Sequence, residues 1–300
     1  MPLRVAVTGA SGFIGSALVP ALLAQGHHVV RLTRTSAPRH ETVVWDPARG
    51  QLDPAALSDI DAVVHLAGAR VDERWTAAHK RDILASRVDG TSVLARVIAT
   101  LRPAPRVFVS ASAIGFYGDR GDDPVDEQTP AGTGFLAQVA RAWEDAAAPA
   151  RDAGIRTVHP RFGIVLGRGG GALSKLLPVF ELGAGGKIAH GTQWMSWIAR
   201  DDVVRALCFV IAAEAMQGPI NVTAPNPVTN ADFAKALGHV LHRPAMATIP
   251  AFALRLMYGE LADEALLAGQ RVFPRALQAA GFSFLYPKVE DAFRHELGRK

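Results

Sequence analysis

The sequence predicts an α/β fold in which helices cover a parallel sheet, and two observations support this prediction. Short β-rich apolar runs alternate with helical patterns from Leu3 to about Arg161, as in successive strand–helix–strand units. A glycine-rich turn also joins the first apolar run to the first helical pattern. The expected strands are Leu3–Thr8, His28–Thr33, Ala62–Leu66, Arg106–Ser112 and Ile155–Arg161, and the expected helices are Gly12–Gln25, Thr76–Thr100 and Thr133–Ala153.

Each element follows from a local signal. The first strand, Leu3–Thr8, is an apolar run that ends at the glycine turn, and the helical pattern of Gly12–Gln25 comes directly after it. Thr76–Thr100 fits one long helix or a broken one. Gly154 follows Thr133–Ala153 at the position where glycine commonly ends a helix. The pattern does not give the order of the strands in the sheet.

The sequence pattern changes beyond Arg161. There, the glycine-rich segments 167–171 and 183–186 lie on either side of an apolar helix expected around Leu173–Leu182. We therefore expect a dinucleotide-binding domain over 1–165 and a smaller lobe over 166–300, and 200–225 remains open as a segment that returns to the first domain. The other expected elements are a helix over Asp201–Glu214, a strand and turn over Pro219–Pro227, a helix over Asn230–Leu241 and a last helical region near the C-terminus.

Composition excludes several classes of protein. The chain has 300 residues, of which 49% are hydrophobic, so it can form a normal core and is neither disordered nor fibrous. Its 32 basic residues are mixed with 28 acidic ones, giving a formal charge of +4 without a basic run, so we expect no nucleic-acid partner. The single cysteine, Cys208, lies in an apolar run and predicts core packing.

No apolar stretch reaches the ~18 residues of a membrane span, and no charged-then-apolar leader opens the sequence. We expect a cytoplasmic protein without a membrane partner, which acts on a small molecule as a monomer or a homodimer.

The turn after the first strand has the spacing of a dinucleotide-binding loop. Gly9 permits a tight turn, Gly12 lets the backbone approach a pyrophosphate, and Gly15 lets the helix pack on the strand. The N-terminus of the following helix offers N–H groups and a partial positive charge to the phosphates. These features predict a Rossmann-type, doubly wound parallel sheet with a smaller C-terminal α/β lobe.

The end of the second strand favours NADP(H) over NAD(H). Enzymes that use NAD usually carry an acidic residue about 20 residues past the glycines, to bond the ribose 2′-hydroxyl. Residues 30–34 instead read VRLTR, with no carboxylate and two guanidinium groups. We expect Arg34, helped by Thr33, to bind a 2′-phosphate. In the alternative reading Arg34 is only a surface charge.

Further motifs indicate a family. The glycine loop, the segment DAVVHLAGA at 61–69 and the segment VSAS at 109–112 with Tyr117 and Gly118 resemble the extended and atypical short-chain dehydrogenase/reductases. The segments SAIGFYGD at 112–119, GFLA at 134–137, QWMSWI at 193–198 and GQRVFP at 269–274 are similar to an epimerase-like subfamily of the NAD-dependent epimerase/dehydratase family, which has a small C-terminal domain of unknown function. The resemblance covers essentially the whole chain.

The resemblance implies a set of site residues. Ser112 matches the serine that positions a carbonyl or hydroxyl beside the nicotinamide in active relatives. The implied pyrophosphate-binding residues are Gly9, Ser11, Gly12, Phe13, Ile14 and Gly15; Thr33 and Arg34 face the adenosine 2′ position, and His65, Leu66, Ala67 and Gly68 border the coenzyme.

The catalytic pattern of those relatives is incomplete here. They pair the serine with a Tyr-x-x-x-Lys on the next long helix, where a lysine lowers the pKa of the phenol. Phe135 and Val139 occupy the expected positions, and neither can transfer a proton. Tyr117 is the nearest substitute, as the candidate acid, and the alternative is a packed aromatic. Conceivable cationic helpers are Lys80, Lys175 and Arg161, each of which also fits a structural role.

The region expected to bind the substrate also differs from the pattern of those relatives. Met195 takes the place of an arginine that grips a diphosphate in sugar-nucleotide relatives, so Trp194, Met195 and Trp197 are expected to form an apolar wall, unless they are core packing. Asp201 and Asp202 are predicted to cap a helix. The histidines show no metal-ligand spacing, which predicts no metal site.

Two hypotheses follow. The first is an NADP(H)-dependent, epimerase-like oxidoreductase with a small substrate that bears no diphosphate, using Ser112 and Tyr117. The second is a catalytically silent NADP(H)-binding regulatory or scaffold protein, favoured by Phe135 and Val139.

Overall fold

A parallel sheet forms the centre of the molecule, as the computed structural model describes it for residues 1–35 and 41–299. Seven strands follow the order β13-β8-β5-β4-β1-β2-β3, and the short β6 pairs with β8 beside β5. This order confirms the predicted doubly wound α/β fold. The strands are β1 (Arg4–Thr8), β2 (His28–Thr33), β3 (Thr42–Val44), β4 (Ala62–His65), β5 (Val107–Ser110), β6 (Ser112–Ala113), β8 (Arg156–Phe162) and β13 (Gly218–Val222).

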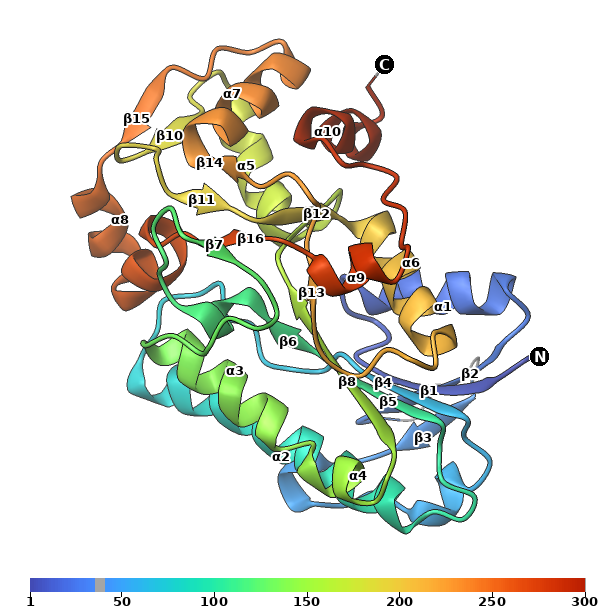
Figure 1. Ribbon diagram of the computed structural model, residues 1–300. Coiled ribbons are helices and arrows are strands. Elements are labelled where there is room, and N and C mark those ends of the chain that lie inside the picture. Colours follow the sequence, from blue (N-terminus) through green and yellow to red (C-terminus); the bar gives the residue numbers. More distant parts are fainter. Residues whose placement is uncertain (36–40, 300) are drawn as a thin grey trace.

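Both faces of the sheet are covered by helices (Figure 1). Because side chains alternate along a strand, Val5 and Val7 face one layer while Ala6 faces the other. One layer contains α1 (Gly15–Ala24) and α6 (Arg200–Ala212), and the other contains α2 (Ala77–Thr100), α3 (Phe135–Asp145) and α4 (Ala148–Asp152).

Most helices and strands lie close to the positions predicted from the sequence. β2 has the predicted bounds, and α2 is a single unbroken helix. The predicted helix 133–153 is instead two helices, because Pro149 lacks the N–H that a continuous helix needs and lies in the first turn of α4. Gly154 has a φ of +82°, as expected for a residue that ends a helix. The three-residue edge strand β3 was not predicted.

The later part of the chain lies over the carboxyl ends of the strands (Figure 1). Its apolar core joins α5 (Gly171–Glu181), α7 (Asn230–Leu241) and α10 (Val289–Leu297) around Trp197 and Phe233. Its other elements are β9 (Ile164–Gly167), β10 (Gly186–Ile188), β11 (Trp194–Met195), β12 (Trp197–Ala199), β14 (Val228–Thr229), β15 (Ala247–Ile249), α8 (Ala251–Tyr258), β16 (Arg271–Val272) and α9 (Arg275–Ala279).

The two parts are interleaved. The strand β13 lies at the edge of the main sheet beside β8, and α6 packs with α1. β16 pairs with β7 (Pro124–Val125), a strand from the loop after β6. Single helical turns complete the chain at Pro47–Arg49, Pro54–Leu57, Ile114–Tyr117 and Ala262–Leu267.

Within residues 1–35 and 41–299, none of the helices combines the length and the apolar character needed to cross a membrane.

Candidate functional site

The turn between β1 and α1 requires glycine at two positions for reasons internal to the fold. Gly9 has a φ of +65°, and a Cβ on it would lie 2.9 Å from the carbonyl carbon of Leu66. A Cβ on Gly15 would lie 2.2 Å from the carbonyl oxygen of Gly9, which is a severe clash. Both glycines therefore let the turn, the helix and the neighbouring strand end approach one another.

Gly12 is open on its outer side. It is exposed, and within 4 Å a Cβ on it would meet only the Gly9 carbonyl oxygen, at 3.1 Å. The helix α1 that follows has no side-chain cap and no acidic residue in its first turn. Its N-terminal dipole is therefore available to an external anion. These residues fit the pyrophosphate of a dinucleotide.

The remaining residues of this loop are divided between the open side and the protein. Ser11 is exposed, whereas Phe13 and Ile14 are half-buried. The ring of Phe13 lies against the second lobe, so that a Cβ on Gly170 would come within 2.3 Å of it. The glycines of the 167–171 loop therefore allow the second lobe to contact the nucleotide-binding loop directly.

Arg34 is exposed and follows β2 directly. It lines a cavity of about 750 Å³ together with Trp45, Ala69 and Ser86. The side chain of Thr33 donates to the Thr35 carbonyl oxygen over 2.6 Å. The structure thus places a guanidinium group, and no carboxylate, at the end of the second strand.

Four carboxylates also line this cavity, those of Asp46, Asp53, Asp82 and Asp89, and the first two already accept backbone hydrogen bonds. Asp46 accepts from the N–H groups of Ala48 and Arg49, and Asp53 accepts from that of Ala55. Both acids therefore begin single helical turns, and their positions do not require a ligand.

His65 ends β4 with its side chain completely buried. Its Nδ1 lies 2.7 Å from the Thr8 hydroxyl oxygen, which also accepts from the N–H groups of Leu66 and Ala67. Burial, and secondarily the charge of Arg87, lower the pKa of His65 to about 3. The imidazole is therefore neutral at ordinary pH and braces the strand end, while Leu66, Ala67 and the exposed Gly68 lie nearer the surface.

Acid is expected to destabilise the protein through its buried histidines. The folded pKa of His65 lies below its unfolded value of about 6.5, and burial lowers the pKa of His159 too. The unfolded chain therefore takes up these protons first, so stability is complete above about pH 6.5 and falls as pH decreases toward 3, by a few kcal/mol. Urea unfolding at several pH values measures this.

The variant His65→Gln should flatten that pH dependence, whereas His190→Gln, at an exposed histidine, should not change it. An equally steep loss of stability in His65→Gln would contradict the assignment.

Ser112 belongs to a buried polar network. It lies in β6, in register with Arg161 on β8. Its hydroxyl donates to Glu144 of α3 over 2.7 Å. Arg161 donates to both oxygens of the same carboxylate, each over 2.8 Å, and its guanidinium carbon lies 3.5 Å from the centre of the Phe116 ring. Ser112 and Arg161 are almost fully buried.

Tyr117 completes this network. It is fully buried, accepts a hydrogen bond from Arg161 over 3.0 Å and donates its own proton to the side chain of Asn221 over 2.7 Å. Burial raises the pKa of Tyr117 to about 12, although Arg161 and Asn221 oppose that shift. The geometry thus gives the hydroxyl two protein partners and suits a positioning residue better than a proton donor.

The helix α3 contains neither tyrosine nor lysine. Phe135 and Val139 instead pack in an apolar cluster that includes Trp75 and Ile83. The cationic helpers are occupied elsewhere: the ammonium of Lys80 lies 2.8 Å from Glu260, and that of Lys175 lies 2.7 Å from Asp72. Of the three candidates, only Arg161 lies beside Ser112 and Tyr117.

The expected apolar wall is mostly core packing. Trp197 is completely buried in the core of the second lobe, and its indole N–H donates to the Asn226 carbonyl. Met195 packs against the same core, and its sulfur accepts from the amide of Asn230. Trp194 is half-buried, and its indole N–H donates to Asp122. The wall prediction is therefore wrong for Trp197, because a local pattern does not tell a ligand-facing ring from a core ring.

Asp201 and Asp202 lie in the first turn of α6, but no side-chain cap forms there. The Asp202 carboxylate accepts instead from the N–H groups of Leu285 and Tyr286, over 2.8 and 2.9 Å. The predicted cap is therefore wrong in detail: Asp202 holds the returning C-terminal segment.

Comparison with known proteins identifies the family. The model of the NAD dependent epimerase/dehydratase family matches residues 5–223. The chain belongs to this family. Residues 249–296 match a domain of unknown function (DUF1731). The resemblance inferred from the sequence motifs is confirmed for both parts.

Relatives of similar length extend this result. The chain is 44% identical over 296 residues to "Epimerase family protein Mb2239" of Mycobacterium bovis, with 98% of each chain covered. A crystal structure of the human epimerase family protein SDR39U1 with NADPH is 32% identical, with a TM-score of 0.90 over 99% of this chain and 100% of that one.

A nucleoside-diphosphate sugar epimerase from Corynebacterium glutamicum is 38% identical, with a TM-score of 0.82 over 99% of this chain and 59% of that one.

Proposed function

We propose that this chain binds NADP(H) and uses it in an oxidoreductase or epimerase-like reaction. Arg34 carries the proposal, because it stands at the position where NAD-selective proteins of this fold present a carboxylate. The open side of Gly12 and the uncapped N-terminus of α1 supply the pyrophosphate site. The similar human protein was crystallised with NADPH, which supports the same choice of coenzyme.

Replacing Arg34 tests the choice of coenzyme. Charge-assisted hydrogen bonds are worth about 1.5–3 kcal/mol each, so Arg34→Gln should weaken NADPH binding by roughly 10–150-fold while changing NADH binding little. Fluorescence titration gives both dissociation constants. Arg49→Gln is a matched control, since Arg49 is exposed beside the same cavity and pairs with Asp46. Equal losses for NADPH and NADH would reject a 2′-phosphate contact.

The bound coenzyme would accept or donate a hydride at its nicotinamide ring. Ser112 would hold the reacting substrate oxygen and pass a proton to Glu144 when a hydroxyl is oxidised. Arg161 would hold the Glu144 carboxylate in position through its two hydrogen bonds. Tyr117 would act as a positioning residue by holding Arg161. The Ser112–Glu144 pair thereby takes the place of the missing Tyr-x-x-x-Lys.

Two substitutions separate these roles. Ser112→Ala should reduce turnover at least about 100-fold with unchanged NADPH affinity, the scale expected for one general acid–base group. Tyr117→Phe should lower stability by about 1–3 kcal/mol, since Asn221 loses its donor, while turnover persists at a reduced rate. Steady-state kinetics and urea unfolding measure both effects. Complete loss of turnover in a folded Tyr117→Phe protein would instead indicate that Tyr117 is the catalytic acid.

The substrate we propose is a small molecule without a diphosphate. Met195 carries this choice, because it stands where sugar-nucleotide relatives place a phosphate-binding arginine and its sulfur is engaged by Asn230. The name of the Corynebacterium relative states a nucleoside-diphosphate sugar. A substrate panel should therefore include UDP-sugars beside small carbonyls and alcohols, and turnover of UDP-sugars alone would reject the choice.

A silent NADP(H)-binding regulatory or scaffold protein is the second candidate. It is favoured by the near-complete burial of Ser112 and Tyr117, whose protons both go to protein acceptors. It predicts tight NADPH binding without hydride transfer to any member of the panel, and a partner that is bound only in the presence of the coenzyme.

A further inference from the structure

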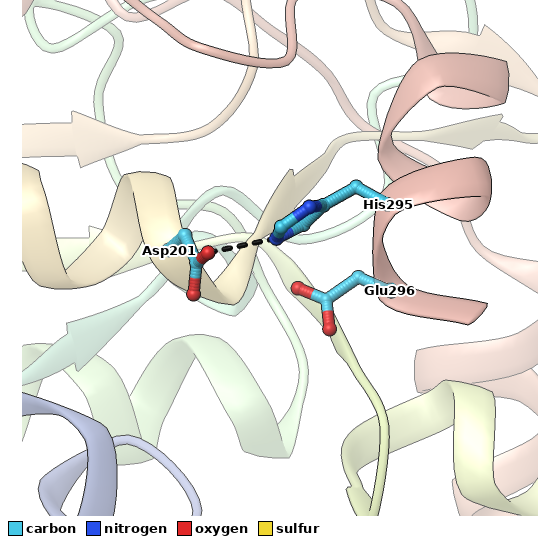
Figure 2. Close-up of side chains that lie close together, drawn as sticks. All are labelled: Asp201, His295 and Glu296. Atoms are coloured by element: carbon cyan, nitrogen blue, oxygen red, sulfur yellow. Dashed lines mark hydrogen bonds and ion pairs between the residues drawn. The ribbon is translucent and has the colours of Figure 1, made fainter. Parts of the chain in front are cut away.

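A second group of chemically reactive side chains lies where α6 meets α10, away from Ser112. Asp201 lies in the first turn of α6, and His295 and Glu296 lie near the end of α10. Figure 2 shows the three side chains pointing toward one another from the two helices. Each offers one ligand atom, and these atoms lie within 4.8 Å of one another. Their separation in the sequence hides this arrangement from any spacing motif.

The geometry of this group is partly fixed. The Nε2 of His295 lies 2.8 Å from a carboxylate oxygen of Asp201. The imidazole stacks on the Tyr286 ring, with centroids 4.4 Å apart and planes inclined by 19°. Asp201 and His295 have side chains that are 44% and 39% exposed, so an ion can enter from solvent.

Glu296 supplies the observation that points to a ligand. Its residue is only 8% exposed, and one carboxylate oxygen accepts from the Arg168 N–H over 3.2 Å. The other oxygen, Oε1, is buried and has no hydrogen-bond partner among the residues that the structure describes. A buried carboxylate oxygen without a partner is costly. A surface Asp201–His295 pair alone leaves this oxygen unexplained.

We propose that Asp201, His295 and Glu296 bind one divalent transition-metal ion of the zinc class, with water completing its coordination. An imidazole with two carboxylates is a ligand set that suits such ions. Ligands at about 2.1 Å from a zinc ion are roughly 3.4 Å apart, a spacing that falls within the 4.8 Å over which the three ligand atoms lie. This proposal differs from the prediction of no metal site, which was based only on the spacing of the histidines along the sequence.

The ion would join the C-terminal helix to α6. Asp202, next to Asp201, already holds the N–H groups of Leu285 and Tyr286. Glu296 also holds the backbone of Arg168, in the loop whose glycines contact Phe13. The metal would therefore stabilise the C-terminal segment and the loop that lies against the nucleotide-binding turn.

Calorimetry with the full chain, freed of metal by a chelator and then dialysed, tests the proposal with Zn²⁺ and Co²⁺ alone. We expect one equivalent of each ion, a Co²⁺ absorption band in the visible range and a higher Tm with Zn²⁺. His295→Ala and Glu296→Gln should each weaken binding by at least about tenfold. Glu296→Gln keeps an oxygen for the Arg168 N–H, so loss of folding is not expected.

His239→Ala is the matched control, because His239 is an exposed histidine that lies 3.6 Å from the carboxylate of Glu290. It should bind the metal as the wild type does. Absence of stoichiometric binding to the wild type, or equal affinity in the wild type and Glu296→Gln, would overturn the proposal. If His295→Ala does not fold, Asp201→Asn decides the point with the same expected loss.

Discussion

Replacing Arg161 by methionine is expected to lower the free energy of unfolding by about 3–5 kcal/mol. The side chain of Arg161 is only 4% exposed, and it is the cation that lies against the Glu144 carboxylate, itself 13% exposed. Removing it leaves a largely buried negative charge without its partner and takes a donor from Tyr117. Urea unfolding followed by circular dichroism measures the loss.

A double substitution and a surface control sharpen this experiment. Arg161→Met with Glu144→Leu should recover part of the lost stability, since both charges are then absent. Arg294→Met should cost less than about 1 kcal/mol, because the side chains of the Arg294–Glu290 ion pair are 36% and 41% exposed and water screens the pair. A loss in Arg161→Met no larger than in Arg294→Met would mean that the buried network contributes little to stability.

Gly12→Ala is expected to weaken NADPH binding by about 100-fold or more, which corresponds to about 2.7 kcal/mol. The added methyl group would occupy the space through which the backbone approaches the pyrophosphate. Within the protein it would meet only the Gly9 carbonyl oxygen, at 3.1 Å, so the change in folding stability should stay below about 1 kcal/mol.

Two other glycines are controls for this substitution. Gly26→Ala, at a φ of +81° with no atom within 4 Å of the added Cβ, should cost stability and leave NADPH affinity unchanged. Gly15→Ala should disrupt the turn itself, because its Cβ would lie 2.2 Å from the Gly9 carbonyl oxygen. Wild-type NADPH affinity in Gly12→Ala would contradict the proposed phosphate site.

Local signals predicted the nucleotide-binding half well. The strand His28–Thr33 has the bounds expected from the sequence, and so does the helix Asn230–Leu241 of the second lobe. The glycine turn was predictable because its constraints arise within a few residues, where tight turns and helix starts are determined. The short edge strand β3 escaped because three residues contain too little periodicity to be recognised.

The buried network was not predicted, because its members come together only when the strand order is known. Ser112, Glu144, Arg161 and Asn221 lie on four separate elements. One weak signal was available: Leu136, Ala140 and Glu144 share a helix face at intervals of four residues, and Ala140 is buried. An acidic residue in line with a buried small residue is a candidate for a buried ion pair.

The prediction of an apolar wall at Trp197 and that of a helix cap at Asp202 were wrong for the same reason. An aromatic ring beside a predicted loop can face a ligand or the core, and an acid at a helix start can cap that helix or hold another segment. Trp197 packs in the core, and Asp202 binds backbone groups 83 and 84 residues away in the sequence. Only the tertiary arrangement distinguishes these outcomes, since both are compatible with the same local pattern.

Calorimetric titration of the purified wild-type chain with NADPH and with NADH tests the coenzyme assignment most directly. The arrangement of Gly12, the start of α1 and Arg34 predicts saturable binding of one NADPH per chain, at least about tenfold tighter than NADH. No binding of either nucleotide by the folded protein, or NADH bound as tightly as NADPH, would contradict it.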